Sequence, residues 1–183
     1  MYLNRSTINM QSLLAFIATI ILMQACNTQE QEQTPTIPDQ LEINKGMEEI
    51  NRQFVIDENA QIDGYIERHG WEMTKTGTGL RYMLIETGAG PVAVEGQIIS
   101  VAFIVSLLDG EELYSSADGP AKDILIGQDN VESGLHEAMT YLRKGDRATI
   151  ILPSYLAHGL SGDGNKIPPR SSVVYDILVV DLK

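Results

Sequence analysis

Few residue types in this chain of 183 residues could carry out covalent or metal chemistry. There is one cysteine, Cys26, so neither an intrachain disulfide nor a two-cysteine redox motif can form. The three histidines, His69, His136 and His158, lie far apart and lack metal-ligand spacing, so the sequence predicts no metal site. The chemistry open to the chain is therefore attachment through Cys26 and binding through non-covalent contacts.

Cys26 follows a segment that has the properties of a secretory signal. Residues 13–23 form an apolar run that contains one threonine, Arg5 precedes it, and no acidic residue occurs before Cys26. A membrane-spanning helix needs about 20 apolar residues, so this run is too short to span a bilayer. The stretch Leu-Met-Gln-Ala-Cys at positions 22–26 resembles a lipobox, the cleavage site of lipoprotein signal peptidase. We expect residues 1–25 to be a lipoprotein signal peptide and Cys26 to be lipidated.

The segment that follows supports this interpretation over the alternative of a buried core cysteine. Residues 26–40 are rich in Gln, Glu, Thr and Pro, a composition that predicts a disordered tether. Two or more lipid chains hold a protein stably on a membrane. We therefore expect a cell-envelope protein, lipid-anchored at the periplasmic face of the inner or outer membrane. Asn27 beside the cysteine, where no Asp occurs, favours the outer membrane.

The composition sets limits on partners. Apolar residues make up 43% and charged residues 21%, which is ordinary for one globular domain. The 25 acidic and 13 basic residues give a net charge of −12. Such a surface repels phosphate backbones, so we expect no nucleic acid partner.

Two helical segments are expected in an N-terminal region of residues 41–77. Met47, Ile50 and Phe54 recur on one helical face, and a second segment repeats this spacing from Ile62 to His69. Asp57 is a candidate N-cap for the second segment, and Gly70 is a candidate stop. These helices are expected either to pack on the following domain or to pair with another copy.

From residue 78 onward the pattern changes to strands and turns. Asp109-Gly110 between apolar segments predicts a hairpin turn. One helix is expected over residues 131–142. Five strands are expected, at residues 80–86, 98–108, 122–126, 148–152 and 173–182. Residues 78–183 therefore predict an α+β domain in which one helix covers one face of an antiparallel sheet.

Residues 78–183 also carry motifs of a known family. The most specific is LRKGDRATIILPSYLAHG at positions 142–159, followed by Pro168-Pro169 and a closing strand that contains Tyr175. These motifs, in this order, resemble the FK506-binding-protein (FKBP) class of peptidyl-prolyl cis-trans isomerases. The arrangement of lipoprotein signal, helical region and one such domain also resembles the gliding-motility-associated isomerase lipoproteins.

The resemblance implies a five-stranded half-barrel sheet wrapped around one short helix, with an apolar pocket between them. It implies a peptidyl-prolyl isomerase that acts on proline-containing segments of exported proteins without a metal or cofactor. The backbone N–H of Glu132 is expected to bond the bound peptide, and His158 to lie at the rim. The residues expected to form the site are Phe103, Leu113, Val131, Glu132, Leu135, His158, Ile167 and Tyr175.

Several positions differ from the pattern of the family that this domain resembles. Phe103 and His158 stand where Tyr is usual, Leu113 where Phe is usual, and Tyr114 where a buried Asp is usual. Lys122 stands where an aromatic residue is usual. These changes keep an alternative open: a catalytically weakened binding or chaperone module of a cell-envelope complex. A third alternative is a structural component that docks through residues 41–76.

Overall fold

The computed structural model describes residues 40–117 and 119–183. The expected signal peptide, Cys26 and most of the expected tether lie outside the described residues. Lys45–Lys183 form one compact unit, which contains the whole sheet and most of the long helix. In the part of the chain that the structure describes, no helix is both long and apolar enough to cross a bilayer.

The N-terminal helical region is one continuous helix, α2 (Gln40–His69). The expectation of two segments with a cap at Asp57 is therefore wrong. Asp57 lies inside the helix, where its carboxylate accepts a 2.8 Å hydrogen bond from Gln53, one turn earlier. The predicted stop at Gly70 is confirmed: Gly70 has a φ of 64°, and the backbone N–H of Trp71 donates to the carbonyl of Ile66.

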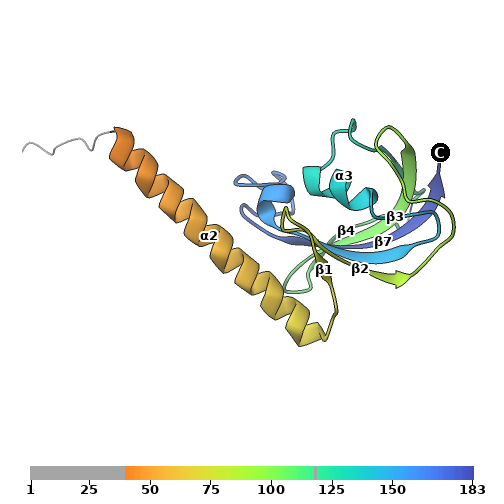
Figure 1. The fold of residues 1–183 in the computed structure, drawn as a ribbon, viewed down its shortest axis with the longest axis horizontal. Coiled ribbons are helices and arrows are strands. Elements are labelled where there is room, and N and C mark those ends of the chain that lie inside the picture. Colours follow the sequence, from red (N-terminus) through yellow and green to blue (C-terminus); the bar gives the residue numbers. More distant parts are fainter. Residues whose placement is uncertain (1–39, 118) are drawn as a thin grey trace, which may run out of the picture. The chain divides into compact units, whose positions relative to one another are not determined.

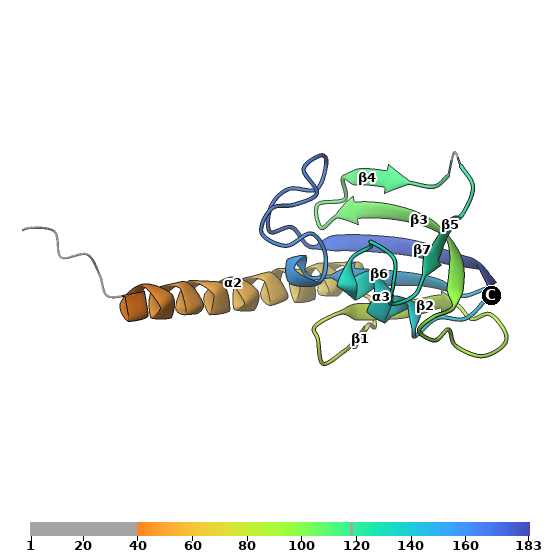
Figure 2. The same cartoon turned by 90° about the horizontal axis from the view of Figure 1, so that it is seen from above.

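The domain is built on a seven-stranded antiparallel sheet with the order β1-β2-β6-β7-β3-β4, and β5 pairs with β3. The long strand β3 shares one edge with β7, while β5 and then β4 share its other edge (Figure 2). The strands are β1 (Thr74–Lys75), β2 (Arg81–Glu86), β3 (Ile98–Leu107), β4 (Glu112–Ser115), β5 (Lys122–Leu125), β6 (Arg147–Leu152) and β7 (Val173–Leu182).

The α+β class with an antiparallel sheet is confirmed, and the count of five strands is corrected to seven. The two additional strands are β1, with two residues, and β4, with four. The Asp109-Gly110 turn joins β3 and β4 as predicted, with Gly110 at a φ of 92°.

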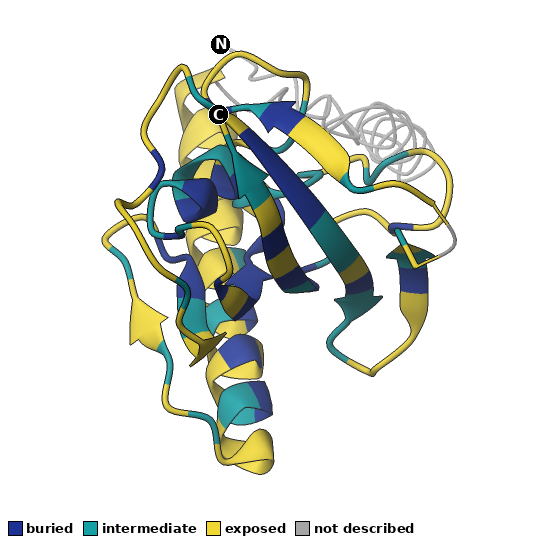
Figure 3. Ribbon diagram, turned by 90° about the vertical axis from the view of Figure 1, so that its right-hand side faces the viewer, coloured by how far each residue is buried: buried dark blue, intermediate teal, exposed yellow. Residues whose placement is uncertain are grey.

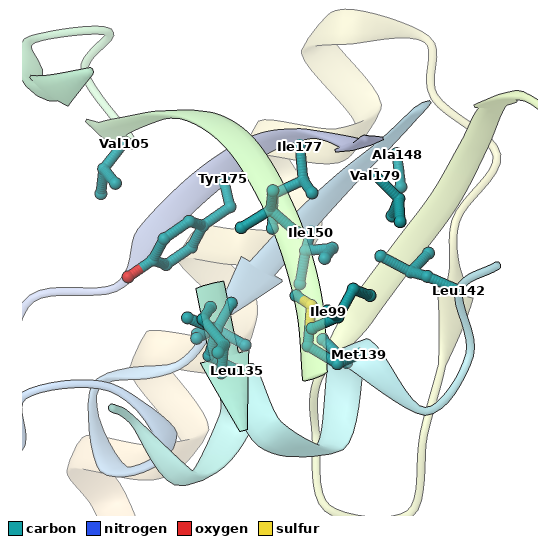
Figure 4. Packing of buried hydrophobic residues seen from close by; sticks show 14 of the residues in the cluster. Ile99, Val105, Leu135, Met139, Leu142, Ala148, Ile150, Tyr175, Ile177 and Val179 are labelled. Atoms are coloured by element: carbon teal, nitrogen blue, oxygen red, sulfur yellow. The ribbon is translucent and has the colours of Figure 1, made fainter. Parts of the chain in front are cut away.

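The short helix α3 (Ser133–Met139) lies over one face of the sheet (Figure 1). It is shorter than the expected 131–142, because Glu132 is extended at its N-cap and the chain tightens after Met139. Tyr141 and Leu142 bond to carbonyls three residues back, as in a 3₁₀ turn. Figure 4 shows Leu135, Met139 and Leu142 facing Ile150, Tyr175, Ile177 and Val179 of the sheet.

A second, smaller core lies on the opposite face of β6 and β7. Alternate strand residues point to opposite faces, so Ile151 and Val174 point away from α3. They pack with Ile62 and Tyr65 of α2, and both helix residues are buried. Figure 3 shows the alternation of buried and exposed positions along the strands. The C-terminal half of α2 therefore belongs to the folded domain.

Two buried polar residues tie α2 to the domain. The Glu58 carboxylate accepts hydrogen bonds from the Ser154 N–H at 2.6 Å, the Ser154 hydroxyl at 3.2 Å and the Ser172 hydroxyl at 2.7 Å. The buried Arg81 guanidinium donates to Asn59 and Asp63 of α2, each at 2.7 Å. Because buried charges are costly without partners, these bonds make the position of α2 specific.

Candidate active site

A cavity of about 360 Å³ lies between α3, the concave side of the sheet and the loop from Pro153 to Ser172. Its size is in the range of small-ligand sites, typically about 300–1,000 Å³. Strands β3, β4, β5 and β7, helix α3 and the loop all contribute residues to its lining. The lining residues are Val101, Phe103, Val105, Tyr114, Ser115, Lys122, Ile124, Glu132, Leu135, His158, Asp163, Ile167, Tyr175 and Ile177.

The base of the cavity is apolar and belongs to the main core. Phe103 of β3 and Tyr175 of β7 have ring centroids 6.5 Å apart, and both line the cavity. Leu135 comes from α3, and Ile167 comes from the loop; both are buried. In Figure 4, Tyr175 lies on the α3 side of the sheet, with its hydroxyl group pointing away from the rest of the cluster. Such a base accepts a small apolar ring.

The Glu132 carboxylate lies in the cavity wall, and the side chains of Tyr175 and His158 contact it. The Tyr175 hydroxyl donates a 2.8 Å hydrogen bond to Glu132 Oε1. The Nε2 atom of His158 lies 2.6 Å from the same oxygen, close enough for an ion pair when His158 is protonated. Burial raises the pKa of Tyr175, and the Glu132 charge raises it further, so the hydroxyl remains a donor at neutral pH.

Asp163 organises the loop on another side of the cavity. Its Oδ1 accepts the backbone N–H groups of Asn165 and Ile167, each at 2.8 Å, and its Oδ2 accepts the Tyr114 hydroxyl. The hydrogen bond from Tyr114, followed by the two backbone bonds, lowers the pKa of Asp163 to about 2. The carboxylate is therefore ionised at neutral pH, and its donors position Ile167 in the cavity wall.

The structure brings together six of the eight predicted site residues. Phe103, Glu132, Leu135, His158, Ile167 and Tyr175 all line the cavity. Leu113 and Val131 do not line it: Leu113 is buried in the core, and Val131 packs half-buried against that core. The Glu132 backbone N–H donates to no described residue, which leaves it available at the N-cap of α3.

Sequence reasoning missed the ionisable side chains of the wall. Glu132 was expected to act only through its backbone, and Asp163 was not among the expected site residues. Tyr114 was expected to remove an acid from the site, yet it bonds to Asp163, so the wall keeps a carboxylate that comes from another element. The Asp-Gly-Asn sequence at positions 163–165 could have indicated this role, because an Asp in such a turn bonds nearby backbone N–H groups with its side chain.

The described residues also bear on metal binding. Within residues 40–117 and 119–183, no three His, Cys, Asp or Glu side chains lie close enough together to hold an ion. Two pairs of side chains in the cavity wall are bonded to each other, Tyr114 with Asp163 and Tyr175 with Glu132. What this arrangement offers chemically is an apolar base with hydrogen-bonding groups at its edge.

The antiparallel half-barrel, the short helix and the cavity between them define a class of small binding domains, and comparison with known proteins identifies the family. A family model described as FKBP-type peptidyl-prolyl cis-trans isomerase matches residues 90–180. The chain belongs to this family through its C-terminal domain.

Relatives and solved structures agree with this assignment. The FKBP-type peptidyl-prolyl cis-trans isomerase FkpA of Escherichia coli (strain K12) is 28% identical over 129 residues, covering 69% of this chain and 47% of that protein. The probable FkpA of Neisseria meningitidis serogroup B is 29% identical over 125 residues, covering 68% and 43%. This chain therefore spans less than half the length of either relative.

The likeness in structure extends over most of the described residues. A peptidyl-prolyl cis-trans isomerase from Pseudomonas syringae pv. tomato aligns with a TM-score of 0.62 at 21% identity, covering 72% of this chain and 95% of that chain. The N-terminal domain of FKBP42 from Arabidopsis thaliana aligns with a TM-score of 0.58 at 16% identity, covering 61% and 92%. At these identities the likeness shows a shared fold.

Proposed function

We propose that this protein is a peptidyl-prolyl cis-trans isomerase that accelerates X-Pro isomerisation in exported proteins while tethered to a membrane through Cys26. The observation that carries the isomerase activity is the cavity itself. Its apolar base of Phe103, Leu135, Ile167 and Tyr175 suits a proline ring, and the Glu132 N–H at its edge is a donor for the peptide backbone.

Isomerisation requires rotation about a bond with partial double-bond character. The barrier to this rotation is about 18–20 kcal/mol, so uncatalysed X-Pro exchange takes tens of seconds. Twisting the imide reduces its resonance and its charge separation, and an apolar cavity therefore favours the twisted form over the planar one. No bond is made or broken, so the residues of the site need only hold the chain and exclude water.

Five groups of the cavity have a role in this scheme. Phe103, Leu135 and Ile167 contact the ring and keep water away from the imide. The Glu132 N–H bonds a peptide carbonyl beside the proline, which holds one side of the chain while the other side rotates. Tyr175 closes the base and, through its hydroxyl, fixes the Glu132 side chain.

The test is the cis-to-trans relaxation of a short peptide with Leu or Phe before proline. Wild-type protein is expected to accelerate the relaxation, and Leu135→Ala and Tyr175→Ala are expected to abolish the acceleration. Leu178→Ala is the matched control, because Leu178 is exposed on β7 and lies outside the cavity. Circular dichroism of each variant establishes that it is folded. No acceleration by folded wild-type protein would reject the activity.

The polar wall supports a second candidate, a binding module without catalysis. His158 and Tyr175 converge on Glu132, and Tyr114 bonds to Asp163, so the cavity edge is more polar than its base. This candidate predicts that proline peptides bind with no gain in rate. Peptide binding by titration calorimetry, combined with the relaxation assay, separates the two functions.

The membrane tether is a separate part of the proposal and rests on the lipobox-like sequence around Cys26. Wild-type protein expressed in a bacterial host is expected to partition into the detergent phase, and Cys26→Ser is expected to remain in the aqueous phase. Equal partitioning of the two proteins would reject lipidation while leaving the isomerase activity open. The role in folding exported proteins requires refolding assays with an exported, proline-limited substrate.

A further inference from the structure

The Glu132 side chain is the feature of the cavity that isomerisation as described does not use. Only 12% of its side chain is exposed, and one oxygen, Oε1, takes both the Tyr175 hydroxyl and the His158 contact. The second oxygen, Oε2, accepts no hydrogen bond from a described residue. It is also not among the buried polar atoms that lack a partner, so it is accessible. It is therefore open to a ligand or to solvent.

The other charged groups of the cavity do not neutralise the Glu132 carboxylate. Asp163 is occupied on both oxygens by Tyr114 and two backbone N–H groups. Lys122 is the lysine of the lining and is exposed, so solvent screens its charge. His158 contacts Glu132 through Nε2 and carries a positive charge only when it is protonated. With His158 neutral, the wall around Glu132 carries a net negative charge.

Glu132 also lies next to any segment that the site holds. Its own backbone N–H, at the N-cap of α3, is the free donor at the cavity edge. A proline ring on the apolar base therefore places the neighbouring residue beside the Glu132 carboxylate. A partly buried carboxylate attracts a cation or a hydrogen-bond donor on that neighbouring residue and repels another carboxylate.

We propose that Glu132 is a specificity-determining residue that makes the site select proline segments with a lysine or arginine adjacent to the proline. This inference rests on the proposed function and names its substrate class. His158 and Tyr175 act as positioning residues, because they contact Oε1 and leave Oε2 without a protein partner. Segments with an acidic residue at the same place are the poorest substrates.

The test uses the full chain in detergent and matched peptides that differ only beside the proline, with Lys, Leu or Glu either before or after it. Wild-type protein is expected to show a higher kcat/KM for Lys than for Leu in at least one position, and the lowest value for Glu. Glu132→Gln keeps the size and the acceptor atom, and is expected to lower the Lys-to-Leu ratio about tenfold, the loss of one charge-assisted hydrogen bond.

Two further measurements separate charge from structure. Glu48→Gln removes the same charge from an exposed position on α2, outside the cavity, and is expected to leave the ratio unchanged. Added salt is expected to lower the ratio in wild type and to have little effect in Glu132→Gln. A Lys-to-Leu ratio that is the same in wild type and in Glu132→Gln, with peptides still isomerised, overturns the inference.

Failure of the proposed function has a different signature. If no peptide is isomerised, selectivity is measured as the Kd of the same peptides by calorimetry. Tighter binding of the Lys peptide that Glu132→Gln abolishes supports Glu132 as the selecting group in a binding module. Equal Kd values for the Lys, Leu and Glu peptides overturn the inference in that setting as well.

Discussion

The Tyr175 hydroxyl of β7 donates a 2.8 Å hydrogen bond to Glu132 Oε1 at the N-cap of α3, and so joins the base of the cavity to its edge. Tyr175→Phe removes this donor and keeps the ring. A hydrogen bond to a charged group contributes about 1.5–3 kcal/mol, so we expect the free energy of unfolding to fall by about that amount. Urea unfolding at neutral pH measures it.

Tyr141→Phe is the control for this variant. Its hydroxyl also bonds a glutamate, Glu137, but at 3.2 Å and at a less buried place. We expect a change of about 0.5 kcal/mol there. Equal losses of unfolding free energy in the two variants would show that the Tyr175–Glu132 hydrogen bond stabilises the fold no more than the Tyr141–Glu137 bond does.

The buried Glu58 carboxylate is expected to determine whether α2 stays on the domain. Glu58→Gln replaces one of two acceptor oxygens with an NH₂ group that faces the donors of Ser154 and Ser172. We expect a loss of about 2–4 kcal/mol in unfolding free energy, because buried donors lose their partner. Faster hydrogen exchange of the Ser154 amide is the local readout.

Glu49→Gln provides the comparison for Glu58. Glu49 pairs with Arg52 on the exposed surface of the same helix. Exposed pairs contribute at most about 1 kcal/mol, so this substitution is expected to have little effect. If Glu58→Gln proved as mild as Glu49→Gln, the three hydrogen bonds would not be what holds α2 in place.

Gly162 and Gly164 lie in the cavity loop, and alanine substitutions at the two positions separate the cost of a positive φ from the cost of a steric overlap. Both have a positive φ, 68° and 73°, so alanine at either position pays a cost of about 1–2 kcal/mol. A Cβ at Gly164 has open space, whereas one at Gly162 would overlap the carbonyl oxygen of Ile167. We expect Gly162→Ala to cost about 2–4 kcal/mol in total.

The same pair tests whether the loop positions the cavity wall. Gly162→Ala must displace the backbone at Ile167, so we expect it to slow peptide isomerisation, while Gly164→Ala leaves the rate near that of wild type. Thermal unfolding and the relaxation assay measure the two effects. A similar loss of stability and rate in both variants would mean that φ alone, and not the overlap, determines the outcome.

Asp163 is expected to make the fold sensitive to acid. Its pKa of about 2 lies below the ordinary value of 3.8, and the main cause is the hydrogen bond from Tyr114. A carboxyl group with a depressed folded-state pKa stabilises the fold above the ordinary value, and this contribution is lost as the pH falls from 3.8 toward about 2. Tyr114→Phe should raise the pKa of Asp163 and reduce this loss.

Titration of the Asp163 side chain by NMR measures that shift directly. Asp181 serves as the internal reference, because its pKa is lowered chiefly by the hydrogen bond from Lys144, which the variant leaves in place. We expect the Asp163 midpoint to move toward 3.8 in Tyr114→Phe while the Asp181 midpoint stays where it is. An Asp163 midpoint unchanged by Tyr114→Phe would assign the low pKa to the backbone bonds.

Local patterns predicted the long elements of this fold well. β7 was expected at residues 173–182 and is found there, because β-branched residues and alternation act over the whole strand. The stop at Gly70 was also predictable, since it depends on one residue and its φ. The cap predicted at Asp57 was wrong, because α2 continues through Asp57, whose side chain bonds to Gln53 within the helix. Nothing in the local sequence distinguishes the two outcomes.

The candidate site divides in the same way. The type and order of the motifs were enough to name Phe103, Leu135, Ile167 and Tyr175, and all four line the cavity. The placement of Leu113 and Val131 outside the lining depends on small differences in packing, which motif spacing does not report. The partners of Glu132 and Glu58, and the Tyr114 partner of Asp163, lie between 26 and 114 residues away in the sequence.

The sequence by itself determined the fold class, the family and the apolar base of the cavity, because these follow from hydrophobic periodicity and from motifs read along the chain. Only the tertiary structure decided that α2 packs through Glu58 on the domain, and that Tyr175 and His158 converge on Glu132. The physical reason is that hydrogen bonds and charges act over a few ångströms in space, and folding alone brings their distant partners together.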